Sequence, residues 1–269
     1  MKRYIIMLLS VLAIISGCKN VQGEKSAGKE SNNGNIIIFD TLRIKESFPL
    51  DSIDKNSPTL NVDITLLAPK TTDENLNADI SNCIAYAAFG REGSNLQSTL
   101  ESVLKSLTEN YYTLRNSYIN EKDINPDAPW FKAYYMLDSE AVQGPGNIVC
   151  YTVNNEVYEG GAHPYHIISA VNFDATSGKE ITLQDIFTAG CDSLLTERLT
   201  TRLTQQHKAA SVQGLKEMGY SINEMFVTNN FAMEKDSIFF IYNEYEIAPY
   251  SCGNSRIGFK YDELKDILK

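Results

Sequence analysis

The chain has 269 residues, a formal net charge of −10 and 43% hydrophobic residues, a composition that suits a folded protein. The acidic excess argues against nucleic acid as a partner, because phosphates require clustered Lys and Arg. It also argues against a broad electrostatic contact with anionic lipid. We therefore expect no nucleic-acid binding and no membrane contact that depends on surface charge.

The N-terminal residues resemble a bacterial lipoprotein signal. Residues 1–3 are basic, residues 4–15 are apolar but too few to span a bilayer comfortably, and two small residues then precede Cys18. This pattern predicts that residues 1–17 are a signal peptide and that Cys18 is lipidated. An ordinary secretory signal is the alternative. Residues 18–35 are rich in Gly, Ser, Asn and Lys, which indicates a disordered tether. We expect a folded part outside the cytoplasm, anchored by lipid to a membrane of the cell envelope.

The next part of the chain, residues 36–160, is predicted to form an N-terminal α+β domain. Strict alternation of apolar and polar residues indicates a half-buried strand, and apolar residues three and four apart indicate one face of a helix. The turn Gly144-Pro145-Gly146 separates two aromatic-rich strand patterns. In order, we expect a strand over 60–66, a helix over 73–88 after the cap candidates Thr71 and Thr72, a helix over 96–111, and two strands within 130–158.

Residues 161–269 are predicted to form a C-terminal α+β domain. Thr182 and Asp185 have the spacing of a capping pair at a helix start. The other expected elements are a strand over 165–174, a helix bearing Leu195, Leu199 and Leu203, a central strand over 238–242, a strand over 257–261 and a terminal helix over 262–268. Because helices and strands do not alternate one for one, we expect an α+β fold: two small subdomains with mainly antiparallel sheets packed by helices.

Four cysteines remain after Cys18 is set aside. In an exported protein they permit two disulfides, and we favour Cys83–Cys150 and Cys191–Cys252 because each pair stays within one predicted domain. The alternative is that each is a free buried thiol. None has the spacing of a zinc site.

The stretch VYEGGAHPYH, residues 157–166, holds two of the three histidines of the chain. Gly160, Gly161 and Pro164 exclude a helix here, so a turn between two strands is expected. A zinc site needs three or four ligands, and His207 is the only other histidine. The sequence also lacks a Gly-x-Ser-x-Gly elbow and a phosphate-binding glycine loop. We therefore predict no metal, no cofactor and no assigned catalytic residue, although a pair of distant carboxylates for glycoside hydrolysis stays open.

The same motif carries a family resemblance. Residues 158–164 (YEGGAHP), 172–187 (NFDATSGKEITLQDIF) and 245–250 (YEIAPY) resemble the signature of RsiV-type C-terminal domains, family DUF3298. The region before Glu159 is similar to the small domain of PdaC-like proteins, family DUF4163. The resemblance covers about Ile44 to Lys269 and implies an extracytoplasmic module. Some members are anti-sigma factors that bind lysozyme, and others accompany a polysaccharide deacetylase. We find in this sequence neither a transmembrane helix with a sigma-binding segment nor the Asp and His metal ligands of a deacetylase.

These patterns favour a non-catalytic lipoprotein of the cell envelope that recognises cell-wall glycan or a wall-active protein such as lysozyme. Two alternatives stay open: an enzyme acting on cell-wall polysaccharide, and a structural envelope protein. The expected binding residues come from the family motifs and are Tyr158, Glu159, His163, Tyr245 and Tyr250. The sequence does not indicate an oligomeric state.

Overall fold

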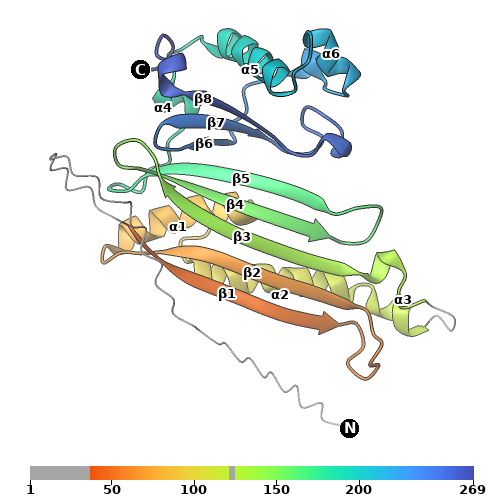
Figure 1. Cartoon of the computed structure of the whole chain (residues 1–269). Coiled ribbons are helices and arrows are strands. Elements are labelled where there is room, and N and C mark those ends of the chain that lie inside the picture. The colour runs from red at the N-terminus through yellow and green to blue at the C-terminus, as the bar shows by residue number, and fades with distance from the viewer. Residues whose placement is uncertain (1–36, 121–124) are drawn as a thin grey trace, which may run out of the picture.

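The computed structural model describes residues 37–120 and 125–269, and shows a five-stranded and a three-stranded sheet with helices packed on both (Figure 1). The predicted α+β fold is confirmed. The predicted signal peptide, Cys18 and the predicted tether lie outside the described residues.

The strands are β1 (Ile38–Pro49), β2 (Thr59–Lys70), β3 (Ala133–Gln143), β4 (Ile148–Tyr158), β5 (Tyr165–Asp174), β6 (Phe231–Met233), β7 (Ser237–Tyr242) and β8 (Ser255–Lys260). The α-helices are α1 (Glu74–Phe89), α2 (Leu96–Tyr112), α3 (Arg115–Asn120), α4 (Leu183–Ile186), α5 (Asp192–Gln206) and α6 (Val212–Glu217). Short 3₁₀ turns are η1 (Pro129–Phe131), η2 (Ile222–Glu224), η3 (Tyr250–Cys252) and η4 (Tyr261–Glu263).

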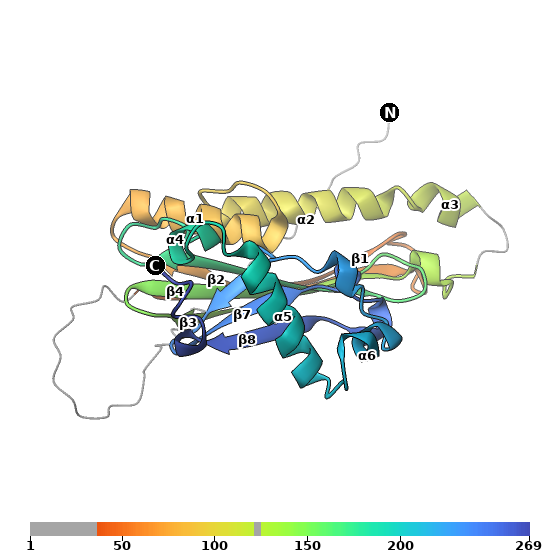
Figure 2. The same cartoon turned by 90° about the horizontal axis from the view of Figure 1, so that it is seen from above.

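The large sheet has the order β1-β2-β3-β4-β5. Its neighbours are antiparallel except β2 and β3, which are parallel. A parallel pair needs a long crossover, and α1, α2 and α3 supply it. Figure 2 shows α1 and α2 on one side of the sheet and β7 and β8 toward the other. The alternation predicted for 60–66 holds, since Val62, Ile64 and Leu66 are buried against Ile80 and Ile84 of α1.

Helix α1 begins at a different cap from the one expected. The Asp73 carboxylate accepts hydrogen bonds from the backbone N–H groups of Asn75 and Leu76, so Asp73 is the N-cap, not Thr71 or Thr72. A carboxylate at this position satisfies two N–H groups that lack a partner within the helix and also suits the positive end of its dipole.

The small sheet, β6-β7-β8, is antiparallel, with β7 at its centre. Helix α5 buries Leu195, Leu199 and Leu203 against it, as predicted. Thr182 and Asp185 form the predicted capping box of α4, and the hydrogen bonds from Thr182 together with Lys179 lower the pKa of Asp185 to about 2.

The terminal helix predicted over 262–268 is wrong. Only the 3₁₀ turn η4 forms, and the chain then continues until Leu268 makes an isolated β-bridge with Phe187. We call the small sheet and the helices α4, α5 and α6 that pack on it the small layer, and Leu264 and Ile267 are buried in its core. The apolar residues therefore drive packing against α4 rather than formation of a further helix.

The strand β5 belongs to the large sheet although it lies beyond the predicted boundary at residues 160 and 161. It pairs with β4 from Tyr165 to Asp174, so the chain passes from one sheet to the other after Asp174. The division into two domains stays a prediction.

The outer edge of β5 is sealed by side chains of the small layer rather than by another strand. The backbone N–H of Ile168 donates to Asn243 Oδ1 at 2.8 Å, and that of Ala170 donates to Asn230 Oδ1 at 2.8 Å. Asn172 itself reaches across, because its amide donates to the Phe231 carbonyl and accepts from the Met233 N–H. An uncovered edge strand promotes unwanted pairing between molecules, and these amides occupy its hydrogen-bonding groups.

All four described cysteines are free, so neither predicted disulfide is formed. Cys83 packs with the core between the sheet and α1, whereas Cys150 is buried on the opposite face, against Ala232 and Ile241 of the small sheet. The large sheet therefore separates this pair, and burial raises the pKa of the Cys150 thiol to about 12. Cys191 lies at the start of α5, which is 15 residues long. The Cys252 thiol instead contacts the carbonyl of Met218, just beyond the end of α6, the helix that follows α5.

Candidate functional site

On the face of the large sheet that points away from α1 and α2, residues of the C-terminal segment cover the side of β5, from Cys150 and Ala170 to His166. We call the uncovered remainder the open face. Side chains of paired residues in adjacent strands lie side by side on one face. The register therefore arranges the open face in rows that cross the strands: Asn61, Tyr134 and Tyr158; then Asp63, Met136, Glu156 and His166; then Thr65, Asp138, Asn154 and Ile168.

A groove of about 510 Å³ follows the second and third of these rows. It spans β2 to β5 and is bounded on the side of the small layer by Asn254. Within the described residues, the side chains of Thr65, Asp138 and Asn154 make no hydrogen bond or ion pair. The groove thus presents a hydroxyl, a carboxylate and an amide whose hydrogen-bonding capacity is available to a ligand.

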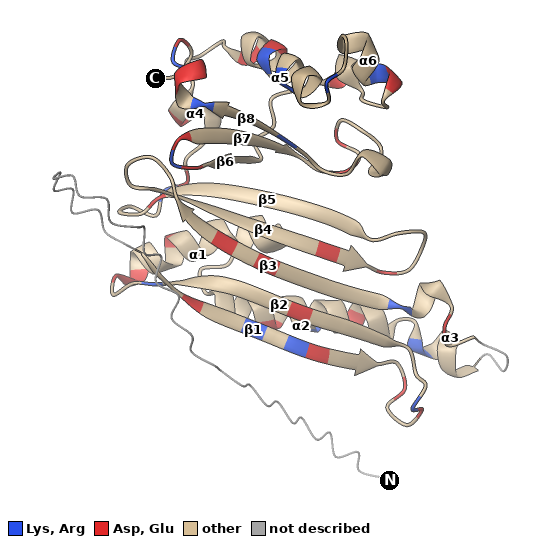
Figure 3. Ribbon diagram, viewed as in Figure 1, with Lys and Arg blue, Asp and Glu red and all other residues tan. Residues whose placement is uncertain are grey.

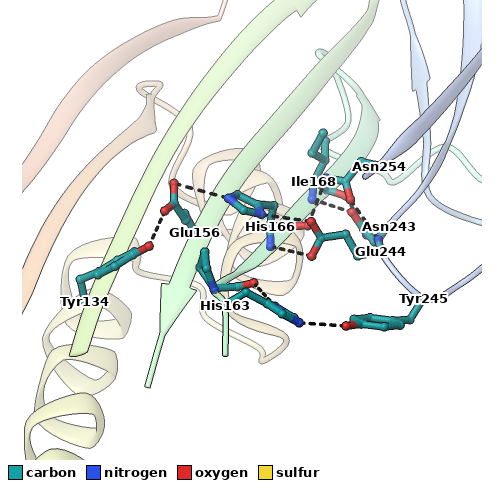
Figure 4. Close-up of polar contacts among 10 residues, drawn as sticks. Tyr134, Glu156, His163, His166, Ile168, Asn243, Glu244, Tyr245 and Asn254 are labelled. Carbon is teal, nitrogen blue, oxygen red and sulfur yellow. Dashed lines mark hydrogen bonds and ion pairs between the residues drawn. The ribbon is translucent and has the colours of Figure 1, made fainter. Parts of the chain in front are cut away.

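A chain of polar contacts links the groove to the small layer (Figure 4). The Tyr134 hydroxyl donates to Glu156 Oε1 at 2.5 Å, and Glu156 Oε2 lies 3.8 Å from His166 Nε2. His166 Nδ1 lies 3.0 Å from Glu244 Oε1, a carboxylate whose side chain is only 7% exposed. The hydrogen bond to Glu156 and partial burial raise the pKa of Tyr134 to about 12. These contacts fix the orientation of Glu156 and His166 at the edge of the groove.

An aromatic pocket of about 210 Å³ lies where α2 and η1 meet the end of the large sheet. Trp130, Tyr134, Tyr158 and Tyr111 contribute its rings, and Glu159 lies at its lining. The rings of Tyr134 and Tyr158 are 5.6 Å apart, and Trp130 is 60% exposed. Tyr134 links the pocket to the groove, because it lines the pocket and its hydroxyl contacts Glu156 of the groove. Leu60, Tyr135 and Val157 of the pocket lining belong instead to the core on the side of the sheet that carries α1 and α2.

The turn between β4 and β5 positions this pocket. Gly160 and Gly161 adopt φ angles of +87° and +109°, which the predicted turn requires of glycine. A Cβ on Gly160 would lie 2.8 Å from the Cα of Trp130, so the turn packs directly on η1. The Tyr111 hydroxyl holds η1 from the other side by donating to the Phe131 carbonyl at 2.7 Å.

The remaining motif residues pack on one another. The His163 ring stacks on Tyr250 at 3.6 Å between centroids, and its Nε2 lies 3.1 Å from the Tyr245 hydroxyl. Its Nδ1 contacts the carbonyl of Pro164 at 2.9 Å. Tyr245 adopts φ +69°, rare for a residue other than glycine. The structure thus gathers His163, Tyr245 and Tyr250 into one cluster and places Tyr158 and Glu159 at the aromatic pocket, while their roles in binding stay predictions.

The sequence did not single out Asp138, Asn154, Glu156 and Trp130 as site residues. Asp138 lies between two buried residues and Asn154 follows the buried Val153, so their position on an exposed face follows from the pattern, whereas Glu156 lies among half-buried residues. Which of them are neighbours depends on the register of four strands, which the pattern does not give.

Acidic residues dominate the part of the open face formed by β2, β3 and β4, whereas Arg43 and Lys45 lie on β1 (Figure 3). The acidic side chains of this part are Asp63, Asp138, Glu140 and Glu156. In residues 37–120 and 125–269, no group of three or more His, Cys, Asp or Glu side chains has an arrangement that could hold a metal ion. No helix in the same described ranges is long and apolar enough to cross a membrane.

Comparison with known proteins shows which family the small layer resembles. Residues 184–262, from α4 to η4, match the model of a family described as a protein of unknown function, DUF3298. This part of the chain is therefore similar to DUF3298. A solved structure of a DUF3298 family member from Bacteroides fragilis superposes with a TM-score of 0.79 at 27% identity, covering 88% of this chain and 96% of that one. A DUF3298 family protein from Pseudomonas aeruginosa shares the fold, with a TM-score of 0.59 at 16% identity and the same coverage.

A longer relative extends the DUF3298 comparison beyond the small layer. The chain is 25% identical over 241 residues to the peptidoglycan-N-acetylmuramic acid deacetylase PdaC of Bacillus subtilis. The match covers 88% of this chain and 48% of the relative, so the chain spans about half the length of that protein. The predicted resemblance to RsiV- and PdaC-like extracytoplasmic domains is confirmed by these findings.

Proposed function

We propose that this protein is a recognition module of the bacterial cell envelope that binds cell-wall glycan across the groove and the aromatic pocket. The observation that carries the proposal is the row Thr65, Asp138 and Asn154, unpartnered within the described residues, together with the rings of Tyr134 and Tyr158 on the far side of the row that contains Glu156. A sugar presents hydroxyl groups at its edge and C–H groups on its faces. The row supplies partners for the hydroxyl groups, and the rings supply flat apolar surfaces for the faces.

The similarity to PdaC supports a role related to the cell wall and a position outside the cytoplasm, since the name of that relative specifies peptidoglycan. Lipid anchoring through Cys18 remains part of the proposal, because that residue lies outside the described ranges. We include recognition rather than catalysis in the proposal because the polar row has the donors and acceptors of a binding surface.

Co-sedimentation with purified, insoluble peptidoglycan tests this function. We expect the protein to pellet with the polymer, and we expect Trp130→Ala and Asn154→Ala to weaken binding. Loss of an aromatic side chain that anchors a ligand costs about 2 kcal/mol or more, which corresponds to at least about thirtyfold in Kd for Trp130→Ala. The matched control is Tyr86→Ala, since Tyr86 is a 68% exposed aromatic residue of α1 outside both hollows.

Failure of the wild-type protein to pellet, or equal losses in Trp130→Ala and Tyr86→Ala, would contradict the proposed site. Release of acetate or of soluble sugar during the incubation would instead favour the enzymatic alternative.

A second candidate function is binding of a basic wall-active protein. The acidic residues of the open face favour it, because they would attract a cationic surface, and the net charge of −10 would add long-range steering. Measuring association with lysozyme at low and high salt tests this candidate. Binding that disappears in Asp138→Asn and at high salt would support it, whereas no association at low salt would exclude lysozyme as the partner.

A further inference from the structure

The charges that face the groove are unbalanced. Its ionisable lining residues are Asp63, Asp138, Glu156 and His166, and no Lys or Arg belongs to the lining. Lys45 Nζ lies 2.7 Å from Asp63 Oδ2 and offsets that carboxylate. Asp138 forms no ion pair with a described residue. Glu156 lies beside His166, but His166 also contacts the carboxylate of Glu244. The groove is therefore negative around Asp138 and Glu156.

These two carboxylates lie on adjacent strands, in neighbouring rows of the open face. Asp138 of β3 is paired with Asn154 of β4, and Glu156 follows Asn154 by two residues on the same face. Such diagonal neighbours are about 7–8 Å apart. The ring of Tyr134 stands beside Glu156, because the hydroxyl of Tyr134 contacts that carboxylate. A ligand in the groove thus meets two carboxylates, which attract a cation, while the Tyr134 ring lies next to Glu156 and outside the lining of the groove.

We propose that the groove selects glycans whose amino sugars carry free, protonated amines over N-acetylated or carboxylate-bearing glycans. This inference rests on the proposed function and adds the chemical class of the ligand. An ammonium group can form an ion pair with Asp138 or Glu156, whereas a neutral acetamide cannot. A carboxylate on the ligand would face like charges with no cationic side chain in the lining.

The expected preference is moderate, because the groove is open to solvent. An exposed ion pair changes Kd by about 1.5- to 5-fold. Two such pairs would give a preference of about 2- to 25-fold for an oligomer that carries several amines. Salt screens exposed charges, so this preference should fall at high ionic strength while contacts to hydroxyl groups persist.

Calorimetry of the full protein with three oligosaccharides of equal length tests the inference: glucosamine oligomers, N-acetylglucosamine oligomers and galacturonic acid oligomers. The titrations are made at about pH 6, below the pKa of an ordinary amine, so that the glucosamine oligomer is cationic. We expect the glucosamine oligomer to bind most tightly and the galacturonic acid oligomer most weakly. The preference should be lost in Asp138→Asn and reduced in Glu156→Gln.

The control is Glu140→Gln, which removes a carboxylate from the same strand and face but outside the groove, and should keep the preference. Equal affinity for the glucosamine and N-acetylglucosamine oligomers overturns the amine preference and leaves glycan recognition standing. An equal loss of preference in Glu140→Gln and Asp138→Asn shows general attraction by the surface and also overturns it. Binding of none of the three oligosaccharides overturns both the inference and the proposed function.

Discussion

Two adjacent glycines in the turn between β4 and β5 have different surroundings. Gly160 and Gly161 both have positive φ angles, but only Gly160 touches another segment, the backbone of Trp130. Nothing lies within 4 Å of a Cβ built on Gly161. The conformation of the turn therefore depends on both residues, whereas the position of Trp130 depends on Gly160 alone.

Substitution of each glycine by alanine separates these two effects. A residue with a Cβ in this region of φ lowers the free energy of unfolding by about 1–2 kcal/mol, and we expect both variants to be destabilised by that amount. Gly160→Ala should lose about 1–3 kcal/mol more, because its Cβ meets backbone that must shift. Urea unfolding measures both values, and Trp130, the single Trp of the chain, reports the shift by its fluorescence. Equal destabilisation by the two variants would show that the contact with Trp130 is unimportant.

At the level of elements, the edge of β5 shows how the two sheets are joined. Asn172 is 1% exposed and uses its side-chain amide as a substitute for one peptide unit of a neighbouring strand. Its contacts with Phe231 and Met233 attach β6 to the large sheet. The family match begins at residue 184, after β5, so the DUF3298 segment docks on an edge that an earlier part of the chain provides.

Asn172→Ala should therefore destabilise the protein strongly. The substitution leaves the Phe231 carbonyl and the Met233 N–H without their partner, at about 1–3 kcal/mol for each buried group. We expect a loss of about 2–5 kcal/mol in the free energy of unfolding, measured by urea denaturation. Asn154→Ala, on the exposed face of β4, is the matched control and should change stability by about 0.5 kcal/mol or less. A loss for Asn172→Ala as small as that of the control would mean that the edge seal contributes little.

At the scale of the whole molecule, local patterns predicted most elements but not how they assemble. The alternation in residues 60–66 and the leucine spacing in α2 and α5 correctly indicated a strand and two helices. The strand β1 was not predicted, because its exposed side chains break the alternation. The parallel pairing of β2 with β3 spans three helices, and no local pattern encodes a contact over that separation.

The site was harder to predict than the fold for the same reason. Motif residues such as His163 and Tyr250 stood out in the sequence and form a stacked cluster. Asp138 and Asn154 carry no motif and become neighbours of Thr65 only through the register of β2, β3 and β4. The glycine pair was predicted to form a turn, but its contact with Trp130 joins segments about 30 residues apart in sequence and could not be read locally.

The central claim is that the groove and the aromatic pocket bind one glycan together, and the fluorescence of Trp130 tests it most directly. Trp130 lines the pocket, whereas Asp138 lines the groove and not the pocket. Titration with soluble peptidoglycan fragments should give a saturable change in emission. Asp138→Ala should raise the apparent Kd of that change by about threefold or more, while Glu140→Ala should leave it unaltered. No change in emission at saturating ligand, or the same Kd in Asp138→Ala as in the wild-type protein, would contradict a single site.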